Sequence, residues 1–354
     1  MREVLAESLL AKMMGWSKEE IYQERPKLQA LADLKYNEYE QFSAGMMFVE
    51  SLTRWLYQFD QIEDRKVAYE FIMRNLIFIS SEQLEHLVSI SFSDKINPLL
   101  LREAGKRSGM RQHQVKKIAA SRYYRELLRK SLFIGLSDGS RIDQLRRLSS
   151  LDNEQVLGTY HISPDKATDL ITDLNNKCPD SKFEIVFLID DFTGSGISYF
   201  RLNESSGKIL KFLNQKRLGE LIDWDHLELH ILFYVATRQS INTLHHNLRE
   251  WQASKHRDFL YTVDAVQVIE DDIRSLVLSD TKFISLAERY FDESIITSHY
   301  RKGKCDRPWL GFDECALPLI LHHNTPNNSV VILWLPESGN HKGLFPRTNR
   351  HRDE

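Results

Sequence analysis

A short apolar segment that ends in two acids is the part of the sequence best suited to chemistry. Residues 185–189 read Ile-Val-Phe-Leu-Ile, and Asp190 and Asp191 follow directly. A run of this kind is typical of a buried strand in a parallel sheet. Such a strand would deliver both carboxylates to the carboxyl edge of the sheet, where open α/β sheets bind their ligands. We therefore expect a catalytic site there, with Asp190 and Asp191 as its acids.

The residues that follow the two acids are suited to hold an anion. They read Thr-Gly-Ser-Gly-Ile-Ser, and the two glycines allow tight turns in which successive N–H groups converge. The three hydroxyl groups are further donors, and a helix starting after the turn would add its positive end. A phosphate monoester would fit this turn, while the two acids accept hydrogen bonds from a vicinal diol, as in ribose 5-phosphate. The expected binding residues are Thr193, Gly194, Ser195, Gly196, Ile197 and Ser198.

Two other kinds of nucleotide site do not fit this order of residues. A dinucleotide-binding fold has its glycines first and its acid about 20 residues later, whereas here the acids come first. The P-loop of nucleoside triphosphatases needs the motif GxxxxGK[ST], which the chain does not contain. A plain strand end followed by a tight turn with surface acids remains the alternative without a ligand.

The segment DDFTGSGIS resembles the signature of the phosphoribosyltransferase family. Serines at positions 195 and 198 replace the usual threonines and keep both hydroxyl groups. The resemblance implies glycosyl transfer at C1 of a ribose 5-phosphate donor, either phosphoribosyl pyrophosphate or a nucleotide. It also implies that Mg²⁺ is carried by the diphosphate of the ligand, with no direct protein ligands.

A wider resemblance connects most of the chain to the branch of this superfamily found in bacterial conflict and anti-phage systems. The helical first part, GLSDGSRID and WLGFDECALPLILHHNTPNNSVVILW carry it. Some members of that branch look like effectors encoded beside retron reverse transcriptases, so the resemblance implies a role in defence. A non-catalytic subunit that senses a nucleotide, or binds nucleic acid or protein in a defence complex, is the alternative.

A second loop in this family holds the pyrophosphate, and one short segment occupies its place here. Backbone N–H groups and a guanidinium in this segment would suit a diphosphate. An ordinary turn in which Asp138 or Ser140 caps the next helix is an equally good interpretation. The residues are Ser137, Asp138, Gly139, Ser140 and Arg141.

The segment HHNTPNN, residues 322–328, offers side chains for recognition of a base. Asn324, Asn327 and Asn328 carry amides suited to that role. Asparagine and proline also simply form turns, and the composition favours a loop.

Residues 101–130 are strongly basic, with ten Lys or Arg and two Glu, although the whole chain has a net charge of −3. Such a stripe could bind a nucleic acid or a protein of a defence system. A solvated helix face is the other interpretation. The overall charge argues against a uniformly basic nucleic-acid coat.

The elements that must position these residues change in character near residue 131. Before it, apolar residues recur at helical spacing, as in Phe48, Leu52, Trp55 and Phe59. After it, apolar runs alternate with helical patterns, which predicts an α/β, phosphoribosyltransferase-like parallel sheet flanked by helices. We therefore expect an all-helical domain at 1–130 and a sheet domain at 131–354. The apolar segments 259–269 and 317–334 would form its last two strands.

Length and cysteine usage bound the remaining possibilities. A chain of 354 residues suits two domains. Cys178, Cys305 and Cys315 form no CxxC pair or disulfide ladder, which favours the cytoplasm. No apolar run is long enough to span a bilayer, so no membrane association is expected.

Overall fold

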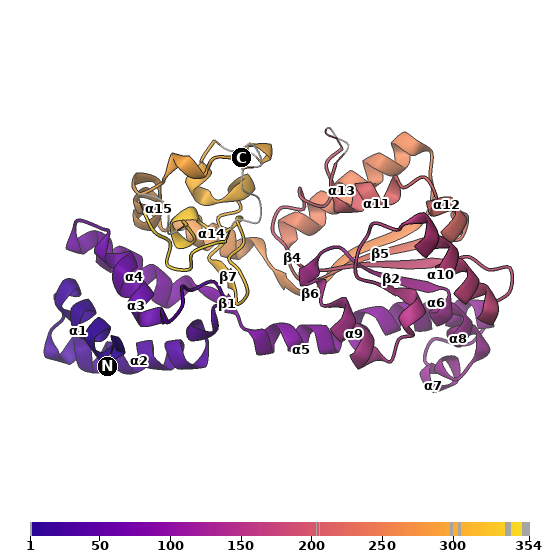
Figure 1. The fold of residues 1–354 in the computed structure, drawn as a ribbon, viewed down its shortest axis with the longest axis horizontal. Helices are drawn as coiled ribbons and strands as arrows, with labels where there is room; N and C mark the ends of the chain where they lie inside the picture. Colours follow the sequence, from indigo (N-terminus) through magenta and orange to yellow (C-terminus); the bar gives the residue numbers. More distant parts are fainter. Residues whose placement is uncertain are drawn as a thin grey trace. The chain divides into compact units, whose positions relative to one another are not determined.

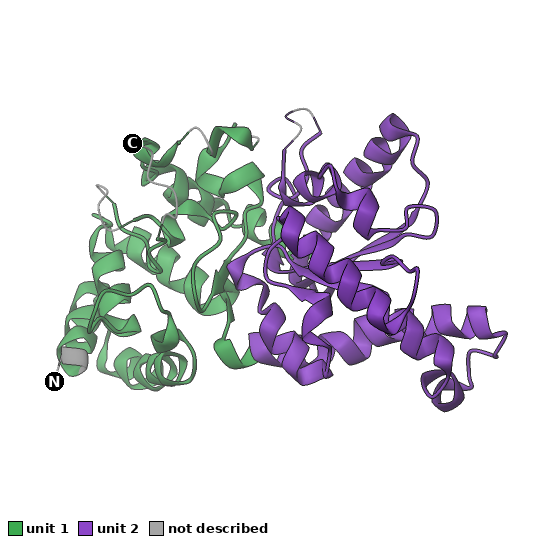
Figure 2. Cartoon of the chain, turned by 45° about the vertical axis from the view of Figure 1, so that its right-hand side comes forward, with its two compact units in different colours: residues 1–83, 271–354 green, residues 84–270 purple. Residues whose placement is uncertain are grey.

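The chain folds into two compact units, each described here by itself. One unit comprises residues 1–83 and 271–354, and the other comprises residues 84–270 (Figure 2). Cys305 lies outside the described residues. The computed structural model describes residues 2–202, 204, 206–297, 300–303, 306–336 and 341–348.

The unit of residues 84–270 contains a five-stranded sheet in which all neighbouring strands are parallel. Every residue of its first and fourth strands in chain order is buried, as expected for a sheet covered on both faces. The strand order is β3-β2-β4-β5-β6. The strands are β2 (Ser131–Gly135), β3 (Val156–Leu157), β4 (Ile185–Thr193), β5 (Glu228–Thr237) and β6 (Leu260–Ile269).

The strand order reverses between β2 and β4. From β2 the chain moves outward to β3, then crosses back to β4 and continues through β5 to the opposite edge. In open α/β sheets the crevice outside the carboxyl ends at such a reversal is where ligands bind. The loops that leave β2 and β4 both begin at this point.

Helices cover both faces of this sheet (Figure 1). On one face, α10 and α13 share a continuous apolar core with Val186, Leu188 and Phe233. On the other face, α6 and α8 approach the sheet, and Ser131 Oγ donates to the carbonyl of Leu127 at 2.8 Å. The helices of this unit are α6 (Asn97–Ser108), α7 (Val115–Ala119), α8 (Arg122–Arg129), α9 (Ile142–Ser149), α10 (Pro164–Lys177), α11 (Lys208–Leu213), α12 (Leu218–Leu221) and α13 (Arg238–Lys255). The helix α5 (Ser81–Ser91) runs across the boundary between the units and continues into a π-helical turn, Phe92–Ile96.

The other unit is built from segments at both ends of the chain. Trp55 Nε1 donates to the carbonyl of Ile332 at 2.9 Å, and the rings of Phe71 and Phe283 are stacked. Its two strands, β1 (Ile77–Ile79) and β7 (Leu319–Leu321), pair in parallel. Its helices are α1 (Arg2–Met14), α2 (Lys18–Leu34), α3 (Phe48–Tyr57), α4 (Ile62–Asn75), α14 (Asp271–Ser279) and α15 (Thr281–Arg289). Short 3-10 turns of this unit lie at Tyr36–Glu38, Glu293–Ile295, Tyr300–Lys302, Pro308–Leu310, Phe312–Glu314 and Val331–Leu333, and those of the sheet unit lie at Asp138–Ser140 and Asn153–Gln155.

This division differs from the predicted boundary near residue 130. The helices α6 to α8 belong with the sheet because they pack on its face, and residues 271–354 join the first helices through β1 and β7. Of the two predicted last strands, β6 forms the sheet edge, whereas the only strand within 317–334 among the described residues is β7, in the other unit. The expectation of an all-helical first part fails at β1. No described helix is long and apolar enough to cross a membrane.

Candidate active site

The two loops predicted to bind a ligand meet at the reversal point of the sheet. Strand β2 pairs with β4 so that Gly135 lies opposite Ile189, and Leu136 N–H donates to the carbonyl of Ile189 at 2.9 Å. The next residue, Ser137, donates its hydroxyl to Asp190 Oδ1. The loop after β2 is thereby tied to the first acid at the end of β4.

Gly139 brings the backbone of this loop against the second acid. A Cβ atom at position 139 would lie 2.5 Å from Asp191 Oδ2, closer than two such atoms can approach. Only a glycine therefore allows the observed approach without displacing the carboxylate.

Asp190 is completely buried, and protein groups already occupy both of its oxygens. Oδ1 accepts the Ser137 hydroxyl and the backbone N–H of Asp191, the latter at 3.1 Å. Oδ2 accepts from Tyr199 Oη at 2.9 Å and from Lys208 Nζ at 2.8 Å. A buried carboxylate needs such partners. Asp190 therefore joins the loop after β2 to the loop after β4.

The electrostatics of this cluster follow from burial. Burial raises the pKa of Asp190, as does the neighbouring charge of Asp191, and the opposing effects of Lys208 and Ser137 do not cancel this. Burial, followed by the charge of Asp190, raises the pKa of Tyr199 well above its usual value. Tyr199 is therefore protonated at neutral pH and donates to Asp190 and to the carbonyl of Phe192.

Asp191 is the more accessible of the two acids. Its side chain is partly exposed, and Oδ1 accepts the backbone N–H of Phe192 at 2.8 Å. Successive side chains of a strand point to opposite faces, so the two acids occupy different environments. Asp191 faces the loop containing Gly139.

Thr193 ends β4 and residues 194–198 form a turn, and the prediction that a helix follows this turn directly is wrong. The next helix, α11, starts at Lys208 and has six residues. The backbone folds back at Gly196, whose φ of +79° is a left-handed conformation that favours glycine. A Cβ atom at this position would lie 3.1 Å from the carbonyl oxygen of Ser240, which leaves little room for a side chain. The turn therefore offers no helix end for an anion.

Unpaired donors remain on this turn. Thr193 to Gly196 are buried, Ile197 is partly exposed and Ser198 is exposed. The buried hydroxyl of Thr193 has no hydrogen-bond partner. Within the described part of the chain, the backbone N–H groups of Ser195, Gly196 and Ser198 donate to no protein acceptor. Buried polar groups are usually paired, so the buried donors of this turn are suited to donate hydrogen bonds to a ligand.

The loop after β2 is also stabilised by a hydrogen bond from a residue of β5 that the sequence analysis did not identify. Tyr234 Oη, fully buried on β5, donates to the carbonyl of Ser140 at 2.8 Å. Ser137 Oγ accepts from Gly139 N–H at 3.2 Å, and Arg141 has φ +47° directly before α9. The position that caps α9 is thus Arg141, so the interpretation with Asp138 or Ser140 as cap is wrong.

Tyr199, Lys208 and Tyr234 are the contacts that sequence reasoning missed. Tyr199 directly follows the predicted turn in the sequence, so its position beside the motif could have identified it, whereas Lys208 and Tyr234 carry no local signal. Lys208 and Tyr234 reach the site only through tertiary folding.

Asn324, Asn327 and Asn328 lie in the unit of residues 1–83 and 271–354, where they stabilise a turn. Asn328 is buried and donates to the carbonyl of Phe312 at 3.1 Å. Asn324 Nδ2 donates to the carbonyl of Thr348 at 3.3 Å. The carbonyl of Asn327 accepts from Phe312 N–H at 2.7 Å. Their role in base recognition stays a prediction.

No group of three or more His, Cys, Asp or Glu side chains in the described residues is arranged to hold a metal ion. A parallel α/β sheet that places an acid pair and a turn with unpaired donors at its reversal point defines the phosphoribosyltransferase-like class of domain. A model of the PRTase-CE family matches residues 52–347, and the chain belongs to this defence-associated phosphoribosyltransferase family. The match includes parts of both compact units. No curated protein and no solved structure gave a match.

Proposed function

We propose that the protein catalyses glycosyl transfer at C1 of a ribose 5-phosphate donor, either phosphoribosyl pyrophosphate or a nucleotide. One observation carries this proposal: the Ser137–Asp190 hydrogen bond joins both predicted binding loops at the sheet reversal and leaves Asp191 accessible beside them. The family membership supports the same class of chemistry.

The two acids would have different roles in this reaction. Asp191 would accept hydrogen bonds from the ribose hydroxyls and face the positive charge that develops on the sugar. Asp190 would hold the loops in place, because its oxygens are already occupied by protein donors. Positioning of the sugar and preorganised charge would supply most of the rate enhancement.

The turn and the loop after β2 would bind the phosphoryl groups. The N–H groups of Ser195, Gly196 and Ser198 and the hydroxyl of Thr193 are the unpaired donors for the 5-phosphate. With phosphoribosyl pyrophosphate, the bond between C1 and the diphosphate oxygen would break and the electron pair of this bond would leave with the diphosphate. Arg141 would stabilise the negative charge of the departing diphosphate. The acceptor of the sugar would supply the electron pair for the new bond at C1.

Magnesium would reach the site on the diphosphate of the ligand. Mg²⁺ commonly keeps several waters and binds through substrate phosphates. It would neutralise charge on the departing diphosphate, while Asp191 and the N–H groups of the turn orient the sugar.

The biological role that we propose is that of an effector in bacterial anti-phage defence, acting in the cytoplasm. The defence-associated family supports it. A partnership with a retron reverse transcriptase belongs to the same proposal.

A turnover assay with phosphoribosyl pyrophosphate and Mg²⁺, and with common nucleotides, tests the proposal, with calorimetry alongside. D191N should reduce turnover by about 10²-fold or more, on the scale of losing one transition-state electrostatic contact, without loss of stability. D169N, an exposed acid on α10, is the matched control and should remain active. Unchanged turnover in D191N would refute its role.

The alternative function, a nucleotide-sensing subunit, is favoured by one observation. A single accessible acid is sufficient to recognise a sugar, and Asp190 is not available to assist. Tight binding of a nucleotide that D191N weakens, with no turnover of any donor, would support the sensor. Absence of both binding and turnover would overturn both functions.

A further inference from the structure

Six cations on the segment α6–α8 form a surface that the proposed reaction does not use. All six are exposed, and no carboxylate among the described residues lies within salt-bridge distance of them. We call this set the basic surface. It comprises Arg102, Arg111, Lys116, Lys117, Arg122 and Arg125.

Four acids near this segment are already paired with its other four cations, whereas the exposed Glu126 of α8 interacts electrostatically with Arg122 and offsets one of the six charges. Glu184 binds Arg107 and also Lys130, the latter at 2.8 Å. Glu103 binds both Lys106 and Arg107, at 3.2 and 3.1 Å. The buried Arg129 contacts two further acids, Asp152 and Glu154, at 3.4 and 3.2 Å. The positive charge of the basic surface is therefore not compensated by these acids.

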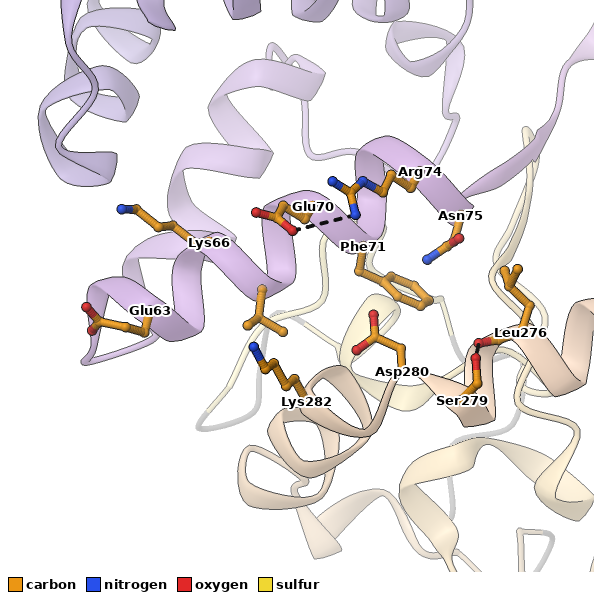
Figure 3. Close-up of a pocket in the computed structure, with 11 residues that line it drawn as sticks. Glu63, Lys66, Glu70, Phe71, Arg74, Asn75, Leu276, Ser279, Asp280 and Lys282 are labelled. Atoms are coloured by element: carbon orange, nitrogen blue, oxygen red, sulfur yellow. Dashed lines mark hydrogen bonds and ion pairs between the residues drawn. The ribbon is translucent and has the colours of Figure 1, made fainter.

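A pocket in the other unit shows the contrasting arrangement. It has a volume of about 450 Å³ and lies between α4 and the region of α14 and α15 (Figure 3). Cations and acids alternate around it, and Arg74 lies 3.8 Å from Glu70. Its charged lining residues are Glu63, Lys66, Glu70, Arg74, Asp280 and Lys282. The three cations and three acids of this lining balance in formal charge, unlike the cations of the basic surface.

The basic surface also lacks the apolar centre of a protein-docking site. Protein interfaces depend on large buried apolar or aromatic anchors. Among the described residues of α6–α8, the exposed large apolar side chain is Val115. Tyr123 is partly buried beneath the guanidinium of Arg122, 5.0 Å from its ring centroid. Concentrated cations without apolar anchors favour a phosphate backbone over a protein partner.

We propose that the basic surface binds the phosphate backbone of a nucleic acid, largely independently of sequence. The net charge of −3 means that this attraction is local and would orient the nucleic acid on α6–α8. The proposal does not depend on the proposed reaction, since its residues are separate from Asp191 and the turn.

Fluorescence anisotropy of the full chain tests the proposal with three labelled probes: a 20-nucleotide single-stranded DNA, the same RNA sequence, and the DNA duplex. Binding should weaken by about 10-fold or more between about 50 and 200 mM salt, because counterions are released from the phosphates. The three probes show which nucleic acid binds most tightly.

The variant K116E/K117E/R122E should lower affinity by at least about 10-fold and reduce the salt slope by roughly 2 to 3. The control K66E/R74E/K282E has the same change of charge at the pocket of Figure 3 and should bind nearly as the parent does. The neutral variant K116Q/K117Q/R122Q should show an intermediate loss, and circular dichroism checks that each variant is folded.

Three results would overturn the proposal. One is that no probe binds at low salt, and another is that both triple reversals weaken binding equally, since net charge alone would then explain it. The third is capture of a protein partner that K116E/K117E/R122E abolishes while no nucleic acid binds. Loss of turnover in D191N has no bearing on these outcomes, so the two proposals fail separately.

Discussion

The ammonium group of Lys208 lies 2.8 Å from Oδ2 of Asp190, which joins the start of α11 to the end of β4 across the intervening turn. Asp190 is completely buried and the Lys208 side chain is 28% exposed. The ion pair therefore closes the loop that carries the unpaired donors of the site. Lys208 Nζ also lies 4.8 Å from the ring centroid of Tyr199, the other donor to the same oxygen.

Replacing Lys208 by methionine should destabilise the protein by roughly 3 kcal/mol, the lower end of the range for removing one partner of a buried ion pair. Urea denaturation at pH 7 measures the loss. The double variant D190N/K208M should recover part of it, because no buried carboxylate is left unpaired. Equal losses in K208M and in the double variant would contradict this assignment.

The loss in K208M should shrink as the pH falls. The pKa of Asp190 is raised in the folded protein, so between its usual value of 3.8 and the folded value the folded state holds more protons. Stability from this group therefore falls as pH rises through that window. Lys208 lowers the pKa of Asp190, so removing Lys208 raises this pKa further and widens the pH window. Urea denaturation at pH 8 to pH 5 should show the difference in free energy of unfolding between K208M and the parent becoming smaller as the pH falls. A difference that stays constant would contradict the assigned pKa effect.

Replacing Gly139 by alanine should impair ligand binding with little change in fold. The added Cβ would lie 2.5 Å from Asp191 Oδ2, so either the loop or the carboxylate must move. Displacing such a group by even 1 Å can cost about 10²-fold in rate. Calorimetry and turnover with phosphoribosyl pyrophosphate measure the effect. G158A is the matched control, because a Cβ there meets nothing within 4 Å. Equal activity in G139A and G158A would show that the close approach is unimportant.

Replacing Tyr199 by phenylalanine should destabilise the protein by about 1–3 kcal/mol. The hydroxyl donates to Asp190 at 2.9 Å and to the carbonyl of Phe192 at 2.8 Å, and the phenylalanine would leave both buried acceptors short of a donor. Thermal and urea denaturation provide the measurement. A variant as stable as the parent would show that water or another donor replaces the hydroxyl.

Glu184 should stabilise the packing of α6 against β4 only above its usual pKa. Burial raises the pKa of Glu184, but hydrogen bonds and charge from Lys130 and Arg107 outweigh that effect and lower it below 4.5. Because the folded-state pKa is depressed, the stabilisation is present above pH 4.5 and is lost as the pH falls through the folded value. E184Q should cost about 1–3 kcal/mol at pH 7 and progressively less below pH 4.5, as urea denaturation at several pH values would show. A loss that is independent of pH would contradict this origin.

The sequence by itself determined the strand β4, the acids at its end and the turn that follows. These are local features, since an apolar run, adjacent acids and glycines specify a strand, its end and a turn without distant contacts. The same local signals located β6 correctly, since the apolar segment 259–269 forms the strand Leu260–Ile269. The predicted helix after the turn failed because Tyr199 directly after the turn donates to Asp190, and the next helix, α11, begins only at Lys208.

The tertiary structure alone decided how the two acids differ and how the chain divides. Adjacent residues of a strand point to opposite faces, so Asp190 is buried against Ser137, Tyr199 and Lys208, and Asp191 faces the loop of Gly139. Likewise, the parallel pairing of β1 with β7 joins residues far apart in the sequence. Contacts between distant segments leave no periodic signal in either one, so only the folded chain shows them.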